Sequence, residues 1–227
     1  MKRIVEPELL DSLPPDDPRA VRSRRDLRRV NTWMRNHVIM ARALEQNGNG
    51  SASGQITELG AGDGNFLFSV AGKISPRWPD MKVTLLDVQK NVPPETLAAF
   101  ANLGWRAEAV VADVFDWSPI EAEIVIANLF LHHFQDARLA ELLQKISERA
   151  KLFIAVEPQR FHRAFTCAQL LRLIGCNEVT LHDAAVSIRA GFMGREISTL
   201  WPDQQNWRLT EQRAGFFSHV FVARRTG

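Results

Sequence analysis

The segment that most narrows the possible folds is a glycine-rich turn that follows a short apolar run. It reads Ile56-Thr-Glu-Leu-Gly-Ala-Gly-Asp-Gly-Asn65 and leads into the amphipathic segment Phe66-Leu-Phe-Ser-Val-Ala71. Glycines let the backbone adopt positive φ angles and approach a ligand closely, and the free N–H groups at a helix start can hold a carboxylate. The pattern therefore predicts a strand, a tight turn and a helix that together hold a nucleotide-like ligand.

The rest of the chain alternates between short apolar runs and segments of helical period. The apolar runs predict strands at 55–59, 82–87, 108–112, 124–127 and 152–156. The periodic segments predict helices near 65–74, 94–103, 135–149 and 160–174. Such alternation is typical of a parallel sheet with helical crossovers on both faces. Two final runs, 207–212 and 216–224, are joined by too few residues for a crossover, so we expect them to pair in antiparallel fashion.

The N-terminal part has a different pattern. Apolar residues recur at three- and four-residue spacing over 27–44, which predicts one amphipathic helix beginning near Arg19. The glycine-rich segment 47–54 that follows has the composition of a flexible connection. We therefore expect a helical cap at residues 1–46, a linker at 47–54 and one α/β domain at 55–227.

Composition restricts the class of protein. The chain has 227 residues, of which 45% are hydrophobic, so it can bury one sizeable core. It has no apolar run of the roughly 18 residues that a membrane helix needs and no apolar stretch typical of a signal peptide. We therefore expect a cytoplasmic protein. Cys167 and Cys176 lack the paired spacing of a zinc site, so we expect two reduced core cysteines and no metal.

Acidic residues mark the ends of three predicted strands. Asn65 replaces the third glycine of the dinucleotide fingerprint, and Glu58 places a carboxylate that disfavours a pyrophosphate but suits an ammonium group. Asp87 and Asp113 could accept hydrogen bonds from ribose hydroxyls and from an adenine amino group. All three acids fall at the carboxyl ends of predicted parallel strands, where open α/β sheets bind their ligands.

These motifs resemble those of the class I S-adenosylmethionine-dependent methyltransferase family, over about residues 55–160 and, through the last strand pair, to the C-terminus. The resemblance implies a Rossmann-like, mostly parallel seven-stranded sheet with an antiparallel last strand, an N-terminal helical cap, and S-adenosylmethionine as cofactor. By this resemblance, the methionine part of the cofactor contacts Glu58, Gly60, Ala61, Gly62 and Gly64. The ribose contacts Asp87 and Val88, and the adenine contacts Asp113 and Val114. Asn128 and Leu129 lie beside the sulfonium.

The segment Asn128-Leu-Phe-Leu-His-His-Phe134 is similar to the part of the family that flanks the methyl acceptor. It lacks the Asn/Asp-Pro-Pro-aromatic signature of enzymes that methylate amino groups of nucleobases or glutamine side chains, so we expect a small-molecule acceptor and O-methylation. A hydroxyl acceptor benefits from a general base of near-neutral pKa. His132 is the predicted base and His133 the alternative, while packing or helix capping is the competing role for both.

Further residues have more than one interpretation. Glu157, Arg160 and Arg189 are predicted either to line the acceptor pocket or to form ion pairs at the surface. Eight arginines and a single aspartate lie within 19–42, which indicates a solvated helix face, attraction of an anionic acceptor or contact with nucleic acid. An RNA-directed methyltransferase, an NAD-dependent oxidoreductase and a non-catalytic methyltransferase-like partner subunit are the alternative functions. We expect neither a membrane nor a nucleic-acid partner.

Overall fold

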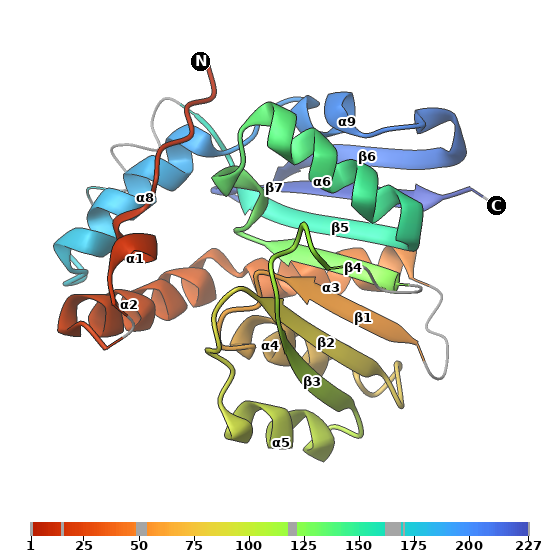
Figure 1. Cartoon of the computed structure of the whole chain (residues 1–227), viewed down its shortest axis with the longest axis horizontal. Helices are drawn as coiled ribbons and strands as arrows, with labels where there is room; N and C mark the ends of the chain where they lie inside the picture. Colours follow the sequence, from red (N-terminus) through yellow and green to blue (C-terminus); the bar gives the residue numbers. More distant parts are fainter. Residues whose placement is uncertain are drawn as a thin grey trace.

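The computed structural model describes residues 2–14, 16–48, 54–117, 122–161, 169 and 171–226. Its centre is a seven-stranded sheet in the order β3-β2-β1-β4-β5-β7-β6 (Figure 1). The strands are β1 (Gln55–Leu59), β2 (Lys82–Asp87), β3 (Arg106–Val111), β4 (Ala122–Asn128), β5 (Ala150–Pro158), β6 (Trp207–Ala214) and β7 (Ser218–Arg225). Strands β1 to β5 pair in parallel, and β7 runs antiparallel to β5 and β6. The predicted mostly parallel sheet with an antiparallel last strand is confirmed.

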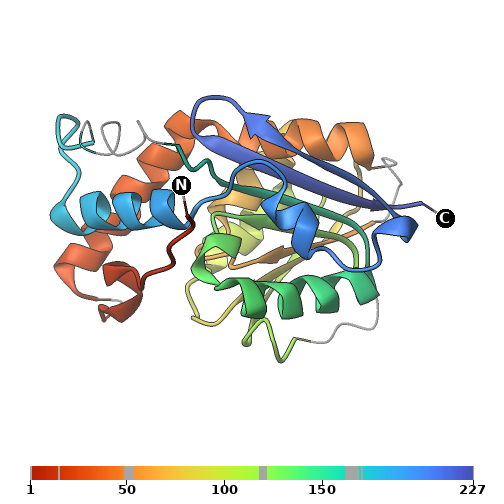
Figure 2. The same ribbon diagram turned by 90° about the horizontal axis from the view of Figure 1, so that it is seen from above.

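Helices cover both faces of this sheet (Figure 2). One face carries α3 (Asn36–Asn47), α4 (Asn65–Ile74) and α5 (Pro94–Asn102), and the other carries α6 (Asp136–Arg149) and α9 (Glu196–Leu200). Side chains of a strand alternate between the two faces, so Ile56 of β1 joins the first buried cluster and Leu59 joins the second. The core therefore lies in two apolar layers, one on each side of the sheet.

A third group of helices gathers at the carboxyl ends of the parallel strands (Figure 1). It comprises α1 (Leu9–Ser12), α2 (Pro18–Met34) and α8 (Glu178–Ala190). The buried hydroxyls of Ser23 and Thr180, 2.9 Å apart, join α2 to α8. The described residues also include two short 3-10 helices, η1 (Leu131–His133) after β4 and η2 (Gln204–Asn206) before β6. The helices of this group cover the sheet edge at which the acidic strand ends meet.

The structure divides the single N-terminal helix that the periodicity predicted. Helix α2 begins at Pro18, after the capping side chain of Asp17, and ends before Arg35, whose φ of 58° breaks the helix ahead of α3. The break is held by Asn36, which is fully buried and whose side chain donates to Asn128 and accepts from Ser218. Spacing of apolar residues does not reveal such a polar anchor, so the prediction of one continuous helix was wrong.

Other predictions have mixed outcomes. The bounds of β1, β2 and α4 are as predicted, whereas α8 and α9 were not predicted. Of the helix predicted at 160–174, residues 162–168 and 170 lie outside the described residues, and 171–175 form turns. Most of the predicted linker, residues 49–53, and Cys167 also lie outside the described residues. Cys176 is a buried free thiol.

The proposed cap and core share one apolar layer. Met40 and Leu44 of α3, which belong to the predicted cap segment, are fully buried against the sheet. The division into cap, linker and core domain therefore stays a prediction. Within the described part of the chain, every helix is too short or too polar to cross a membrane.

Candidate functional site

The glycine-rich turn between β1 and α4 adopts the conformation that its sequence requires. Gly60, Gly62 and Gly64 have φ angles of 66°, 56° and 75°, a region that disfavours other residues. A Cβ on Gly60 would lie 2.3 Å from the ring of Phe130, whereas a Cβ on Gly62 would meet nothing within 4 Å in the described structure. Gly60 is therefore needed for packing, and Gly62 borders open space.

Glu58, in β1 just before this turn, is only 2% exposed. Burial, followed by the nearby charge of Asp63, raises the pKa of Glu58 well above its usual value. Its Oε2 atom has no hydrogen-bond partner among the described residues. A buried carboxylate oxygen without a partner is costly, so this atom calls for a donor that a ligand could supply.

Asp87 and Asp113 have different surroundings. The carboxylate of Asp87 accepts from the N–H of Gly62 and of Gln89, both at 2.8 Å, and so ties the end of β2 to the glycine-rich turn. The exposed carboxylate of Asp113 accepts from the N–H of Phe115 at 2.8 Å and caps the turn that follows β3. Asp87 therefore borders the site, and Asp113 also has a local role.

A pocket of about 1090 Å³ opens in front of the turn. Eight predicted site residues line it: Glu58, Gly60, Ala61, Gly62, Asn128, Leu129, His132 and His133. The other predicted site residues, which do not line it, are Gly64, Asp87, Val88, Asp113, Val114, Glu157, Arg160 and Arg189. The structure thus brings the glycine-rich turn and the segment after β4 to one cavity.

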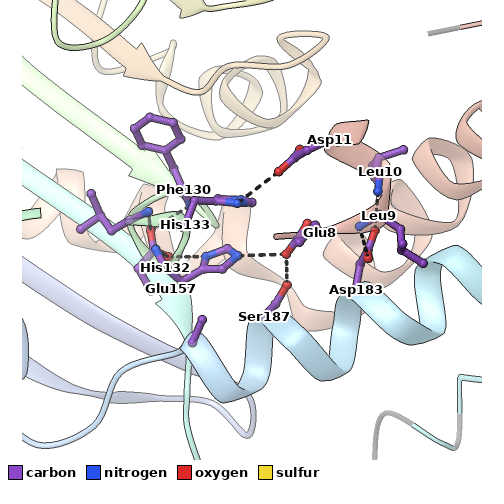
Figure 3. Close-up of polar contacts among 12 residues, drawn as sticks. Glu8, Leu9, Leu10, Asp11, Phe130, His132, His133, Glu157, Asp183 and Ser187 are labelled. Carbon is purple, nitrogen blue, oxygen red and sulfur yellow. Dashed lines mark hydrogen bonds and ion pairs between the residues drawn. The ribbon is translucent and has the colours of Figure 1, made fainter. Parts of the chain in front are cut away.

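His132 is held between two carboxylates (Figure 3). Its Nδ1 lies 2.9 Å from Oε2 of Glu157, and its Nε2 lies 3.4 Å from Oε1 of Glu8. Burial opposes the charged form of the ring, but the hydrogen bonds and charges of these two acids raise the pKa of His132 to about 9. Because a general base needs a neutral ring with a free nitrogen, the structure does not give His132 the environment expected for that role.

His133 differs from its neighbour. Burial and the positive charge of His132 lower the pKa of His133 to about 4, so this ring is neutral near pH 7. Its Nδ1 lies 3.6 Å from Oδ2 of Asp11, whose pKa is raised to about 6 by burial and by the charges of Glu8 and Asp183. One charged and one neutral histidine therefore stand side by side at the pocket wall.

The three predicted acceptor-binding residues have structural partners instead. Glu157 is fully buried behind His132, and Arg160, 1% exposed, bonds to Glu196 and to the carbonyl of Gly191. Arg189 forms an ion pair with Glu6 at 2.8 Å. Burial and internal pairing thus keep all three from lining the pocket, which corrects the first of their two interpretations.

Several pocket residues escaped sequence reasoning. Glu8 and Asp11 come from the N-terminal segment, where no spacing rule marks them. Trp33, Phe161 and Phe217 form an aromatic wall of the pocket. The ring centroid of Phe217 lies 5.3 Å from that of Trp33 and 6.2 Å from that of Phe161. Only the tertiary structure brings these three segments together.

Some of the α2 arginines have internal partners. Arg28 lines the pocket and pairs with Asp63 of the glycine-rich turn at 2.9 Å. Arg22 donates to the carbonyl of Gly175, and Arg29 donates to that of Ile174. Arg28 therefore ties α2 to the glycine-rich turn, and Arg22 and Arg29 tie it to the segment before α8.

The strand order, the antiparallel β7 and the glycine-rich turn at the end of β1 define a class I methyltransferase fold. Residues 56–151 match the family model described as a methyltransferase domain. These residues therefore form a methyltransferase domain, and the sheet to which they belong has the class I methyltransferase fold. No curated protein matches the sequence.

Solved structures with the same fold include three named methyltransferases. The plantazolicin methyltransferase BpumL, in complex with SAH, is 11% identical with a TM-score of 0.65, and the match covers 93% of this chain and 92% of that one. Magnesium protoporphyrin IX methyltransferase (ChlM) from Synechocystis PCC 6803, with bound SAH, is 11% identical with a TM-score of 0.55, covering 85% and 83%. The mitomycin 7-O-methyltransferase MmcR is 18% identical with a TM-score of 0.59, covering 95% of this chain and 60% of that one.

Proposed function

We propose that this chain binds S-adenosylmethionine against the glycine-rich turn and transfers the methyl group to a hydroxyl of a small molecule in the same pocket. The observation that carries the proposal is the unpartnered Oε2 of Glu58, buried beside the turn and lining the cavity. The ammonium group of the cofactor's methionine part would supply the missing donor. The presence of SAH in the BpumL and ChlM structures supports the same cofactor.

The turn itself fits such a ligand. The open space in front of Gly62 would be filled by a side chain, and the half-buried Asp87, which fixes the N–H of Gly62, stands where it could also accept from ribose hydroxyls. When bound, the sulfonium of the cofactor supplies an electrophilic methyl group. The chain's own contribution is to hold donor and acceptor in line and to exclude water.

The acceptor would occupy the part of the pocket between the histidines and the aromatic wall. His132 and His133 offer polar groups at one end, and Trp33, Phe161 and Phe217 offer apolar surface at the other. This combination suits a small molecule with a hydroxyl on an apolar or aromatic body. MmcR, whose name states O-methylation, shares the fold and supports this choice of chemistry.

Calorimetric titration of the purified chain tests the cofactor proposal. We expect SAH to bind and NAD to give no binding heat, because Asn65 replaces the third glycine of the dinucleotide fingerprint. Glu58→Gln should weaken SAH binding by about tenfold or more, equivalent to about 1.4 kcal/mol. Glu108→Gln, on the exposed part of β3, is the matched control and should bind as the parent does. A folded parent protein that binds NAD, or that does not bind SAH, would overturn the proposal.

A further inference from the structure

Three potential metal ligands converge on the wall of the pocket. One donor atom from each of Glu8, His132 and His133 lies within 4.8 Å of the other two. Glu8 and His132 are 124 residues apart in sequence, which is why no ligand spacing was visible. We propose that these three residues bind a divalent transition-metal ion, with an open coordination position that faces the pocket.

The first support is the way His132 is oriented (Figure 3). Its Nδ1 faces Glu157, whose Oε1 also accepts from the N–H of Phe130 and of Leu131 at 3.0 and 2.9 Å. Glu157 therefore fixes the ring and leaves Nε2 directed at Glu8. Metal-binding histidines almost always donate their second ring N–H to such a carboxylate.

The second support is a distance. An N–H···O hydrogen bond is usually about 2.7–3.2 Å long. Nε2 of His132 and Oε1 of Glu8 are 3.4 Å apart, although Ser187 also holds Glu8 in place. Two ligand atoms that each lie about 2.0–2.1 Å from a tetrahedral ion are separated by about 3.3–3.4 Å. The spacing thus fits two ligands of one ion better than a direct ion pair.

The third support is the local charge and the chemistry of the donors. Three carboxylates, from Glu8, Asp11 and Glu157, lie beside the two histidines, and a dication bound among them would balance their negative charge. Oδ2 of Asp11 lies 3.6 Å from Nδ1 of His133, where it is placed to serve as a further oxygen ligand. Imidazole with carboxylate suits zinc, iron or nickel rather than magnesium or calcium.

The N-terminal segment that carries Glu8 is also held in place by contacts within the chain. Both oxygens of Asp183 accept from the backbone, one from Leu9 at 2.8 Å and the other from Leu10 at 3.0 Å. Arg3 bonds to Asp136 and to the carbonyl of Phe134, beside the histidines. An ion here could bind the acceptor hydroxyl and ease loss of its proton to solvent; this role, unlike the site itself, rests on the proposed function.

Titration of the chelator-treated full chain with Zn²⁺ in a calorimeter tests the site. We expect saturable binding of one ion per chain, and a visible absorption spectrum typical of nitrogen and oxygen ligands when Co²⁺ is used. Loss of a residue that only hydrogen-bonds to a metal ligand costs roughly 10–100-fold in metal affinity. We expect Glu8→Gln and His133→Ala each to weaken Zn²⁺ binding by more than this. Glu108→Gln is the matched control for Glu8→Gln, because Glu108 is exposed on β3 and does not line the pocket, and it should bind Zn²⁺ like the parent.

SAH binding, measured on the same samples, keeps the two proposals separate. Absence of saturable Zn²⁺ binding in a protein that binds SAH would overturn the metal site alone. Equal Zn²⁺ affinity in the parent and His133→Ala, or equal losses in Glu8→Gln and Glu108→Gln, would identify adventitious binding and also overturn it. A protein that binds Zn²⁺ through Glu8 and His133 but does not bind SAH would retain the metal site and reject the proposed cofactor.

Discussion

Replacement of Gly62 by alanine should have two separate effects. Backbone strain should lower the free energy of unfolding, and the loss of space for the ligand should lower the affinity for SAH. Gly62 has a φ of 56°, and the Cβ of an alanine would point into open space at the pocket. The left-handed conformation costs a non-glycine residue about 1–2 kcal/mol, partly offset by about 0.4–1 kcal/mol from the stiffer unfolded chain. We therefore expect Gly62→Ala to destabilise the fold by about 1 kcal/mol, a fall in Tm of about 2–4 °C.

The effect on ligand binding should be larger than this. The added methyl group would occupy the space proposed for the methionine part of the cofactor, so we expect at least about a tenfold loss of SAH affinity, or about 1.4 kcal/mol. At an SAH concentration 100 times the parent's Kd, the ligand stabilises the parent by about 2.7 kcal/mol and would stabilise the variant by only about 1.4 kcal/mol. Thermal unfolding with and without SAH measures this difference directly.

Gly104→Ala is the matched control for that experiment. Gly104 also has a positive φ, 76°, and an open Cβ direction, but it does not line the pocket. It should show the same loss of stability and the parent's full stabilisation by SAH. Parent-like SAH affinity in Gly62→Ala would refute the placement of the cofactor. An equal loss of affinity in Gly104→Ala would show that the effect comes through stability alone.

Three further predictions concern the supports of the site. Asp87→Ala should weaken SAH binding by about 1–3 kcal/mol in calorimetry, because the N–H of Gly62 and the ligand would both lose a charged acceptor; unchanged affinity would remove Asp87 from the site. Asn36→Ala should lower the free energy of unfolding in urea by about 1–3 kcal/mol, since Asn128 and Ser218 would lose a buried partner, and parent-like stability would contradict that role. Burial alone would raise the pKa of Glu211, but hydrogen bonds from His219 and Ser198 outweigh it and lower that pKa below the usual 4.5. The stability that Glu211 provides should therefore be present above pH 4.5 and lost as pH falls through the lowered pKa, so the deficit of Glu211→Gln in urea unfolding should shrink in acid; a constant deficit would contradict it.

Local chemistry in the sequence was enough to predict the framework of the site. Glycines that need a positive φ and apolar runs of fixed length specified the turn and the bounds of β1 and α4, because these preferences act within a few residues. The same reasoning placed Glu58 and Asp87 at the ends of neighbouring parallel strands. It also predicted the antiparallel final pair, because a short junction leaves no room for a crossover.

Long-range packing decided the chemistry of the pocket. The sequence by itself predicted a neutral base at His132, but Glu8 arrives from the N-terminal segment and Glu157 from β5, and together they hold the ring in its charged form. The same dependence explains why Arg160, which reads as a pocket or surface residue, is buried against Glu196. Burial and the identity of a side chain's neighbours depend on contacts between segments that are distant in sequence, 36 residues apart for Arg160 and Glu196 and 124 for Glu8 and His132. Turn geometry and periodicity, in contrast, are set by adjacent residues.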